Sequence, residues 1–254
     1  MPPPYVNPHL GDFSAIPHVP AGPVGYVPLK WVSHHSLIGV PVAPILLPNT
    51  QLTRAQVMRI CRDPTYPVLF GYVCAMAWGL QGAEPRGFGH VVAAWGNRVS
   101  IEQKLLALRA GGLTRRDAYN LFTGGNGVPG LGPAYFTKLL YFFGNGLNGY
   151  IMDQWSGKSV NLLTATQVVR MSGNSVSNLN KGGNYQAFCE EVDAMASLLR
   201  GVPGDQVEEM MMSRGGRQPW PWRAHVRKHW PAGVGLYNRQ ALHANYSHIP
   251  LADF

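Results

Sequence analysis

The pattern of apolar and polar positions along the chain predicts a mostly helical protein. Apolar residues recur at helical spacing over residues 54–62, with arginines on the opposite face, and residues 68–80 are almost uniformly apolar. Further helices are predicted over residues 101–110, 114–122, 133–143, 160–170, 185–199 and 205–212. Residues 90–95 fit a short strand or a helix equally well. We therefore expect a mostly α fold of two helical lobes with a cleft between them.

The two ends of the chain differ in composition from the middle. Residues 1–50 are rich in proline, which blocks helix interiors, so they predict an extended Pro-rich N-terminal arm partly ordered against the body. Residues 51–230 are predicted to form the main domain, followed by a C-terminal tail over residues 231–254. The stretch 214–230 interleaves cations with tryptophans. Such a stretch suits a grip on phosphates and bases, or simple attachment of an irregular tail to the body.

The composition narrows the class of partner. Of the 254 residues, 46% are hydrophobic, which is enough for a real core, and the net charge is +8 although only 13% of residues are charged. This basic excess indicates a polyanionic partner, most simply nucleic acid, while a generally basic protein is the alternative. No stretch approaches the ~20 apolar residues of a membrane span, and the N-terminus lacks a signal-peptide pattern. We expect a cytoplasmic protein.

Cysteine usage gives no sign of a metal site. Cys61, Cys74 and Cys189 are widely spaced and form no Cys-x-x-Cys pair. Three cysteines cannot supply the four thiolates of an iron–sulfur cluster. They are predicted to be reduced and buried. The adjacent pair His34–His35 is interpreted as surface or core decoration, and no metal ligands are expected.

A glycine-rich turn over residues 124–133 separates two of the predicted helices. Gly130 and Gly132 bracket one apolar residue, which lets the backbone turn sharply and approach a ligand closely. Pro133 suits the first turn of the next helix, where its missing amide is not needed. The amides at that helix start favour an anion. We predict a DNA-phosphate site here, with contacts from Gly127, Val128, Gly130 and Gly132.

The run Val128-Pro129-Gly130-Leu131-Gly132, followed by a helix and then by Asp153, resembles the helix-hairpin-helix DNA glycosylase superfamily. This superfamily includes endonuclease III and the 8-oxoguanine glycosylases; its hairpin reads Leu-Pro-Gly-Val-Gly, and Asp153 falls at its spacing for a catalytic aspartate. The match is specific over about residues 114–155. It implies a monomeric DNA glycosylase that flips a modified base out of double-stranded DNA, with no required cofactor and room for a monovalent cation at the hairpin. The plainer alternative is a hairpin used for packing, with Asp153 as a helix cap.

The resemblance also implies the chemistry. Asp153 would stabilise positive charge on the sugar and orient or deprotonate the nucleophile. Bifunctional members use a lysine that forms a Schiff base and stands two residues after the last hairpin glycine. That position is Ala134 here, a departure, and Lys138 lies one helical turn further on the same face. If Lys138 does not reach C1′, Asp153 would activate water and no strand cleavage would follow.

Other residues are candidates for contact with DNA. Asn97 would fill the space left by an extruded base and Arg98 would reach its orphaned partner, whereas an ordinary helix-capping loop is the alternative. Candidate walls of the base pocket are Trp78, Tyr150 and Trp155. Each of these aromatic residues, taken singly, is more often structural.

The identity of the substrate is inferred only from the resemblance. The overall sequence is most similar to bacterial proteins of the 8-oxoguanine glycosylase fold, some of which serve antiphage defence, and one kind removes glucosylated hydroxymethylcytosine from phage DNA. The displaced lysine and the unfamiliar N-terminal arm favour a bulky modified cytosine. Repair of 8-oxoguanine is the first alternative. A non-catalytic helix-hairpin-helix DNA-binding protein and a non-DNA enzyme with a coincidental glycine loop are the others.

Overall fold

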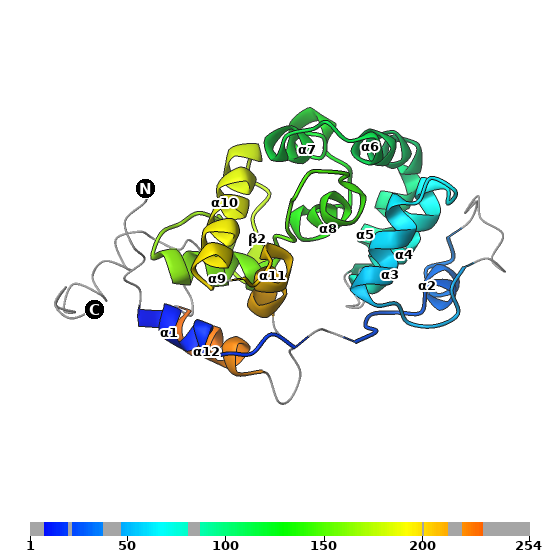
Figure 1. The fold of residues 1–254 in the computed structure, drawn as a ribbon. Coiled ribbons are helices and arrows are strands. Elements are labelled where there is room, and N and C mark those ends of the chain that lie inside the picture. The colour runs from blue at the N-terminus through cyan, green and yellow to red at the C-terminus, as the bar shows by residue number, and fades with distance from the viewer. Residues whose placement is uncertain are drawn as a thin grey trace.

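The structure is a computed structural model that describes residues 8–19, 22–37, 47–80, 87–199, 201–212 and 220–230. Within these ranges the chain forms twelve α-helices, one short 3-10 helix and one two-stranded antiparallel sheet (Figure 1). The α-helices are α1 (Pro8–Ser14), α2 (Pro28–His34), α3 (Arg54–Arg62), α4 (Val68–Trp78), α5 (Gly87–Gly96), α6 (Arg98–Ala110), α7 (Arg115–Asn120), α8 (Pro133–Phe143), α9 (Gln154–Thr164), α10 (Gly182–Leu198), α11 (Gly204–Met212) and α12 (Pro221–His229). The strands are β1 (Met171–Ser172) and β2 (Ser175–Val176). The predicted mostly α fold is confirmed.

Helix α8 connects two groups of helices. Figure 1 shows α2 to α6 on one side of α8, and α9 to α12 with α1 on the other. This is the two-lobed arrangement that the sequence predicted. Helix α8 packs against α3, α4 and α6 of the first group, and it also contacts β2, which packs on α9 of the second group.

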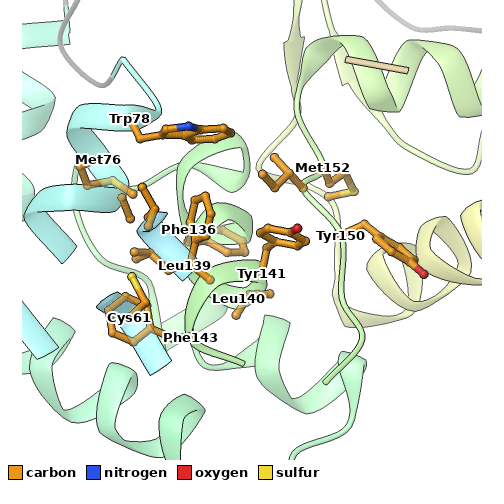
Figure 2. Close-up of a cluster of buried hydrophobic side chains, with 14 of the residues drawn as sticks. Cys61, Met76, Trp78, Phe136, Leu139, Leu140, Tyr141, Phe143, Tyr150 and Met152 are labelled. Atoms are coloured by element: carbon orange, nitrogen blue, oxygen red, sulfur yellow. The ribbon is translucent and has the colours of Figure 1, made fainter. Parts of the chain in front are cut away.

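The centre of the first group is α4, all of whose residues are buried. Gly71 in this helix lets α8 approach, since a β-carbon there would lie 2.7 Å from the ring of Phe143. Cys61 of α3 packs beside the same ring (Figure 2). Helix α4 is the apolar helix that the sequence predicted over residues 68–80. It has 11 residues and ends at Trp78, earlier than predicted. None of the helices in the described ranges is long and apolar enough to cross a membrane.

The second group is built on α9, which packs against α10, α11 and α12. Its helix begins at Gln154, six residues before the predicted start at Val160. Helix α10 also packs on α7, which links this group to the glycine-rich turn. The segment 90–95, left open between strand and helix, lies within α5.

The prediction of an extended N-terminal arm was wrong where the structure describes it. Helices α1 and α2 form within residues 1–50, and Phe13 and Trp31 are fully buried. Both helices begin with a proline, a position where the ring favours helix entry and costs no hydrogen bond. The tail was also not irregular throughout, because α12 forms within the stretch 214–230. The predicted tail over residues 231–254 lies outside the described residues.

The three cysteines are free and buried, as predicted. Burial raises the pKa of both Cys74 and Cys189 to about 12, so these thiols stay protonated at neutral pH. They act as small apolar side chains in the core.

Candidate active site

The glycine-rich turn has the geometry of a tight hairpin between α7 and α8. It comprises a 3-10 turn over Gly124–Asn126 and a second turn that the N–H of Leu131 closes by donating to the carbonyl of Val128 at 3.0 Å. Gly132 then precedes the first turn of α8. Gly130 has φ +80°, and a β-carbon there would overlap the carbonyl oxygen of His90. Because Gly130 has no side chain, the hairpin packs closely against the backbone of α5.

The side chains of the hairpin divide between core and surface. Val128 and Leu131 are buried and anchor the turn, whereas Gly127 and Pro129 are exposed. Of the four hairpin residues predicted to contact DNA, Gly127 is therefore exposed, Gly130 and Gly132 are half-buried, and Val128 is buried.

A buried hydroxyl links the start of α8 to the segment that precedes α9. Thr137 donates a hydrogen bond to the carbonyl of Pro133 at 2.7 Å, and the N–H of Met152 donates to the same hydroxyl at 3.1 Å. Thr137 is fully buried. Because Lys138 follows Thr137 and Asp153 follows Met152, this link fixes the spacing between the backbones that carry the two candidate catalytic residues.

Asp153 is the N-cap of α9. Its Oδ1 accepts hydrogen bonds from the N–H groups of Trp155 at 2.7 Å and Ser156 at 3.0 Å. Ser156 completes the capping box by accepting from the N–H of Asp153 at 2.9 Å. Among the described residues, no hydrogen bond reaches the second oxygen, Oδ2, and the side chain is half-buried. The capping role is thus confirmed, and it occupies only one of the two carboxylate oxygens.

Lys138 lies in α8, and its side chain folds back toward the hairpin. Its Nζ donates to the carbonyl of Ala134 at 2.5 Å, as expected from the direction of helical side chains. Its stem packs on Gly79, where a β-carbon would lie 2.7 Å from Cδ of the lysine. The amine therefore lies beside Ala134, the position at which the resembled family carries its nucleophilic lysine.

The surroundings of Lys138 change its basicity. The side chain is 5% exposed, and burial lowers the pKa of its ammonium group. Asp153 and Glu208 oppose this shift, and Arg54 adds to it. Asp153 is thus close enough to favour the charged form of Lys138, while burial makes the amine more readily deprotonated than that of a solvated lysine.

A buried ion pair joins the two groups of helices near this lysine. Arg54 of α3 pairs with Glu208 of α11, and its guanidinium lies 4.1 Å from the ring centroid of Tyr141. Burial raises the pKa of Glu208 to about 7, although Arg54 opposes the shift. Neither residue was singled out from the sequence. The available signal was an acid set between Val207 and Met210 on an otherwise apolar stripe.

Cations cover Trp155 at the start of α9. The guanidinium of Arg223 lies 3.9 Å from the indole, and Arg227 and Lys158 lie 5.6 Å and 5.2 Å away. Burial lowers the pKa of Arg223 to about 10, and Asp153 opposes that shift. Asp153 therefore has cationic neighbours on two elements, α8 and α12. Sequence reasoning noted the cations of the stretch 214–230 but could not place them beside the candidate aspartate.

The other two predicted pocket aromatics lie apart from each other. Trp78 ends α4 next to Gly79, and hence next to the stem of Lys138, and its indole nitrogen is buried without a hydrogen-bond partner among the described residues. Tyr150 is directed away from Trp78 (Figure 2), and its hydroxyl donates to Asp193 of α10 at 2.6 Å. The structure thus brings Trp78, but not the hydroxyl of Tyr150, to the lysine.

Asn97 and Arg98 lie where α5 meets α6. The side-chain amide of Asn97 donates to the carbonyl of Ala93 at 2.8 Å, and the guanidinium of Arg98 lies 5.9 Å from the indole of Trp95. Asn97 is exposed. Because Gly130 packs on the backbone of α5, this junction neighbours the hairpin.

A surface hollow of about 510 Å³ lies between α7 and α10. It is lined by Thr114, Arg115, Arg116, Asp117, Gln186 and Glu190. None of the predicted site residues is among them. The hollow is therefore a feature separate from Lys138 and Asp153.

The helical architecture and the hairpin that leads to a capping aspartate define the class as an all-α glycosylase fold. A family model described as "Putative 8-oxoguanine DNA glycosylase OGG-like protein" matches residues 17–212, well over half of the chain. The chain belongs to that family. No curated protein and no solved structure matches the chain. The family membership supports a DNA glycosylase in general, with DNA as its substrate.

Proposed function

We propose that this protein is a DNA N-glycosylase in which Lys138 is the nucleophile and Asp153 assists it at C1′ of a flipped nucleotide. The observation that carries the proposal is the position of the Lys138 amine, which lies 2.5 Å from the carbonyl of Ala134. Lys138, one helical turn after position 134, thereby places its amine beside Ala134, the position at which the resembled family carries its nucleophilic lysine. Burial supports the same role, because it lowers the pKa of the Lys138 ammonium and so favours the neutral amine, which is the nucleophile.

The chemistry follows from these two groups. The neutral amine of Lys138 attacks C1′, the bond from C1′ to the base nitrogen breaks, and the base leaves with that electron pair and takes up a proton. Asp153 stabilises the positive charge that develops on the sugar and accepts the proton that the attacking nitrogen releases. Opening of the sugar then gives a Schiff base, from which elimination of the 3′-phosphate cuts the strand.

DNA would be held on both sides of this pair. The exposed edge of the hairpin at Gly127 and Pro129 is suited to the phosphate backbone, and Arg223 and Arg227 supply positive charge at the start of α9. In this proposal Asn97 and Arg98 contact the space and the partner base left by the flipped nucleotide. Trp78 offers, near the lysine, an indole N–H that pairs with none of the described residues and could meet a polar edge of the base.

For the substrate, we propose a bulky modified cytosine, such as glucosylated hydroxymethylcytosine of phage DNA, excised in antiviral defence. The displacement of the lysine from position 134 to Lys138 supports this choice, because the amine then enters from the next turn of α8 and the wall of the pocket is changed. The second candidate is 8-oxoguanine, which is supported by the description of the family. We propose action in the cytoplasm, where reduced, buried cysteines are usual.

A panel of modified duplexes tests the function. Duplexes that each carry one modified base, and intact phage DNA with glucosylated hydroxymethylcytosine, are incubated with the protein and then treated with alkali to cut at abasic sites. We expect cuts in the glucosylated DNA and none in its unmodified counterpart. Cuts only at 8-oxoguanine would assign the repair function instead. Salt-sensitive binding to duplexes with no cut in any of them would identify a DNA-binding protein without glycosylase activity.

A further inference from the structure

Three histidines from the two ends of the described chain converge on one point. His9 lies in α1, and His225 and His229 lie in α12. Nδ1 of His9 is 2.8 Å from Nε2 of His225, and one ring nitrogen from each of the three residues lies within 4.8 Å of the others. Figure 1 shows α1 and α12 side by side, and contact between the rings of Phe13 and Trp222, 4.8 Å apart at their centroids, agrees with this.

The spacing and the neighbours are those of a metal site. His225 and His229 are four residues apart, which places both imidazoles on one face of α12, the arrangement by which helices present two histidines to zinc. Oδ2 of Asp12 lies 3.6 Å from Nδ1 of His225, on the side of the ring away from His9. A carboxylate at the outer nitrogen of a ligating histidine fixes the ring so that its other nitrogen faces the metal.

The charge state also suits a metal. Burial, with the neighbouring His225 and His229, lowers the pKa of His9 to about 4, and burial lowers the pKa of His225 as well. Asp12 opposes both shifts, and Lys228 contributes to the one at His225. The lowered pKa values of His9 and His225 favour the neutral imidazole, which is the form that binds a metal.

Zinc coordination requires His9 and His225 to move slightly apart, and the widest separation between ring nitrogens, up to 4.8 Å, to close by as much as about 1.5 Å. Nitrogen ligands of a tetrahedral zinc ion at 2.0–2.1 Å are about 3.3 Å from each other. The pair of His9 and His225, at 2.8 Å, would therefore open by roughly 0.5 Å. His229 is exposed in the last turn of α12, so its side chain is able to move toward the other two.

We propose that His9, His225 and His229 bind a divalent transition metal ion, zinc being the best match, with Asp12 as the carboxylate that orients His225. This proposal revises the expectation of no metal ligands that the sequence led to. All three histidines lie outside residues 17–212, so the site belongs to the flanking segments and not to the part that the family model matches. The metal would fix α12 against α1, and α12 carries the arginines that pack on Trp155 beside Asp153.

Metal binding by the full-length chain tests the proposal directly. The protein is stripped with a chelator, and Zn²⁺ is titrated against a chromophoric competitor, with Co²⁺ as a spectroscopic probe of tetrahedral geometry. We expect one equivalent to bind, with a Tm several degrees higher when metal is present. We expect His229→Ala to lower the affinity at least tenfold and Asp12→Asn to lower it about 10–100-fold. The matched control is His34→Ala, an exposed histidine of α2, which should bind as the wild type does.

Several outcomes would overturn the site. Absence of stoichiometric binding to the wild type would do so, as would binding that His229→Ala and His225→Ala leave unchanged. Because His229 is exposed, its replacement should leave the metal-free protein folded, which far-UV circular dichroism and the metal-free Tm would verify. These readouts need no DNA. A failure here would therefore leave the glycosylase proposal untouched, and a failure of the glycosylase assay would leave the metal site untouched.

Discussion

The backbone N–H of Met152 donates a hydrogen bond of 3.1 Å to the side-chain hydroxyl of Thr137. The two residues are 15 positions apart and fully buried. Each immediately precedes one of the proposed catalytic residues, Lys138 and Asp153. This contact therefore fixes the spacing between the backbones that carry the amine and the carboxylate.

Replacing Thr137 by valine should lower both stability and activity. Valine keeps the shape but leaves the buried N–H of Met152 without its partner, which costs about 1–3 kcal/mol in the free energy of unfolding. We expect a slower single-turnover release of base as well, because Asp153 would no longer be held at its present distance from α8. Thr137→Ser keeps the hydroxyl and is the control. Equal stability for the valine and serine variants would contradict this account.

Asp153→Asn separates the charge of this residue from its capping role. Asparagine caps helices about as well as aspartate, so the free energy of unfolding should change by less than about 0.5 kcal/mol. The rate of base release should fall by about 10²–10⁴, since the carboxylate charge at C1′ is lost. Denaturant unfolding and single-turnover kinetics measure the two effects. A rate within threefold of wild type would reduce Asp153 to a helix cap.

Lys138 should give the reaction a characteristic pH dependence. Burial lowers the pKa of its ammonium below the ordinary 10.5, and only the neutral amine attacks carbon. Schiff-base formation on an abasic duplex, measured as borohydride-trapped product, should therefore rise with pH and reach half-maximum below pH 10.5. Lys138→Arg, which stays protonated, should abolish it, whereas Lys181→Arg at an exposed position should not. A midpoint at the ordinary lysine value would contradict the proposed role of burial.

Arg223 should contribute to DNA binding through its charge. Arg223→Gln should weaken binding to duplex DNA and reduce the slope of log K against log[salt] by about one, as expected for one lost phosphate contact. Fluorescence anisotropy over a range of salt concentrations provides the measurement. The control is Arg59→Gln, at an exposed position on α3. Equal slopes for both variants would move the phosphate contacts away from α12.

Helices with conventional end signals were predicted correctly from the sequence. The predicted bounds of α3 and α8 agree with the structure, because Thr53 forms a capping box and Pro133 starts α8 at a position where proline is favoured. The hairpin and the capping aspartate were likewise recognised from local residues. Such features depend only on residues that are close together in the sequence, so they can be predicted from the sequence alone.

The helices that were missed or misplaced depend on packing partners that are distant in the sequence. Pro8 and Pro28 each begin a helix, but the prolines of residues 1–50 were interpreted in sequence as helix breakers, because the distinction depends on whether the following turn finds a surface to pack on. Helix α9 was placed too late, since its first turns bury small and polar residues such as Ser156, Gly157 and Ser159 instead of an apolar stripe.

The pairing of charged residues and of histidines around the site could not be predicted from the sequence. The Arg54–Glu208 pair joins residues 154 positions apart, and the histidine cluster joins residues more than 200 apart. Only the approach of α11 to α3 and of α1 to α12 brings these groups together. No local pattern in the sequence contains that information.

The most direct test of the central claim is to identify the residue that attacks the sugar. An abasic duplex is incubated with the protein, the Schiff base is reduced with borohydride, and the adduct is located by peptide mass spectrometry. The account predicts a single adduct on Lys138, present in Asp153→Asn at a lower rate and absent in Lys138→Ala. An adduct on another residue, or no adduct while base release continues, would contradict it.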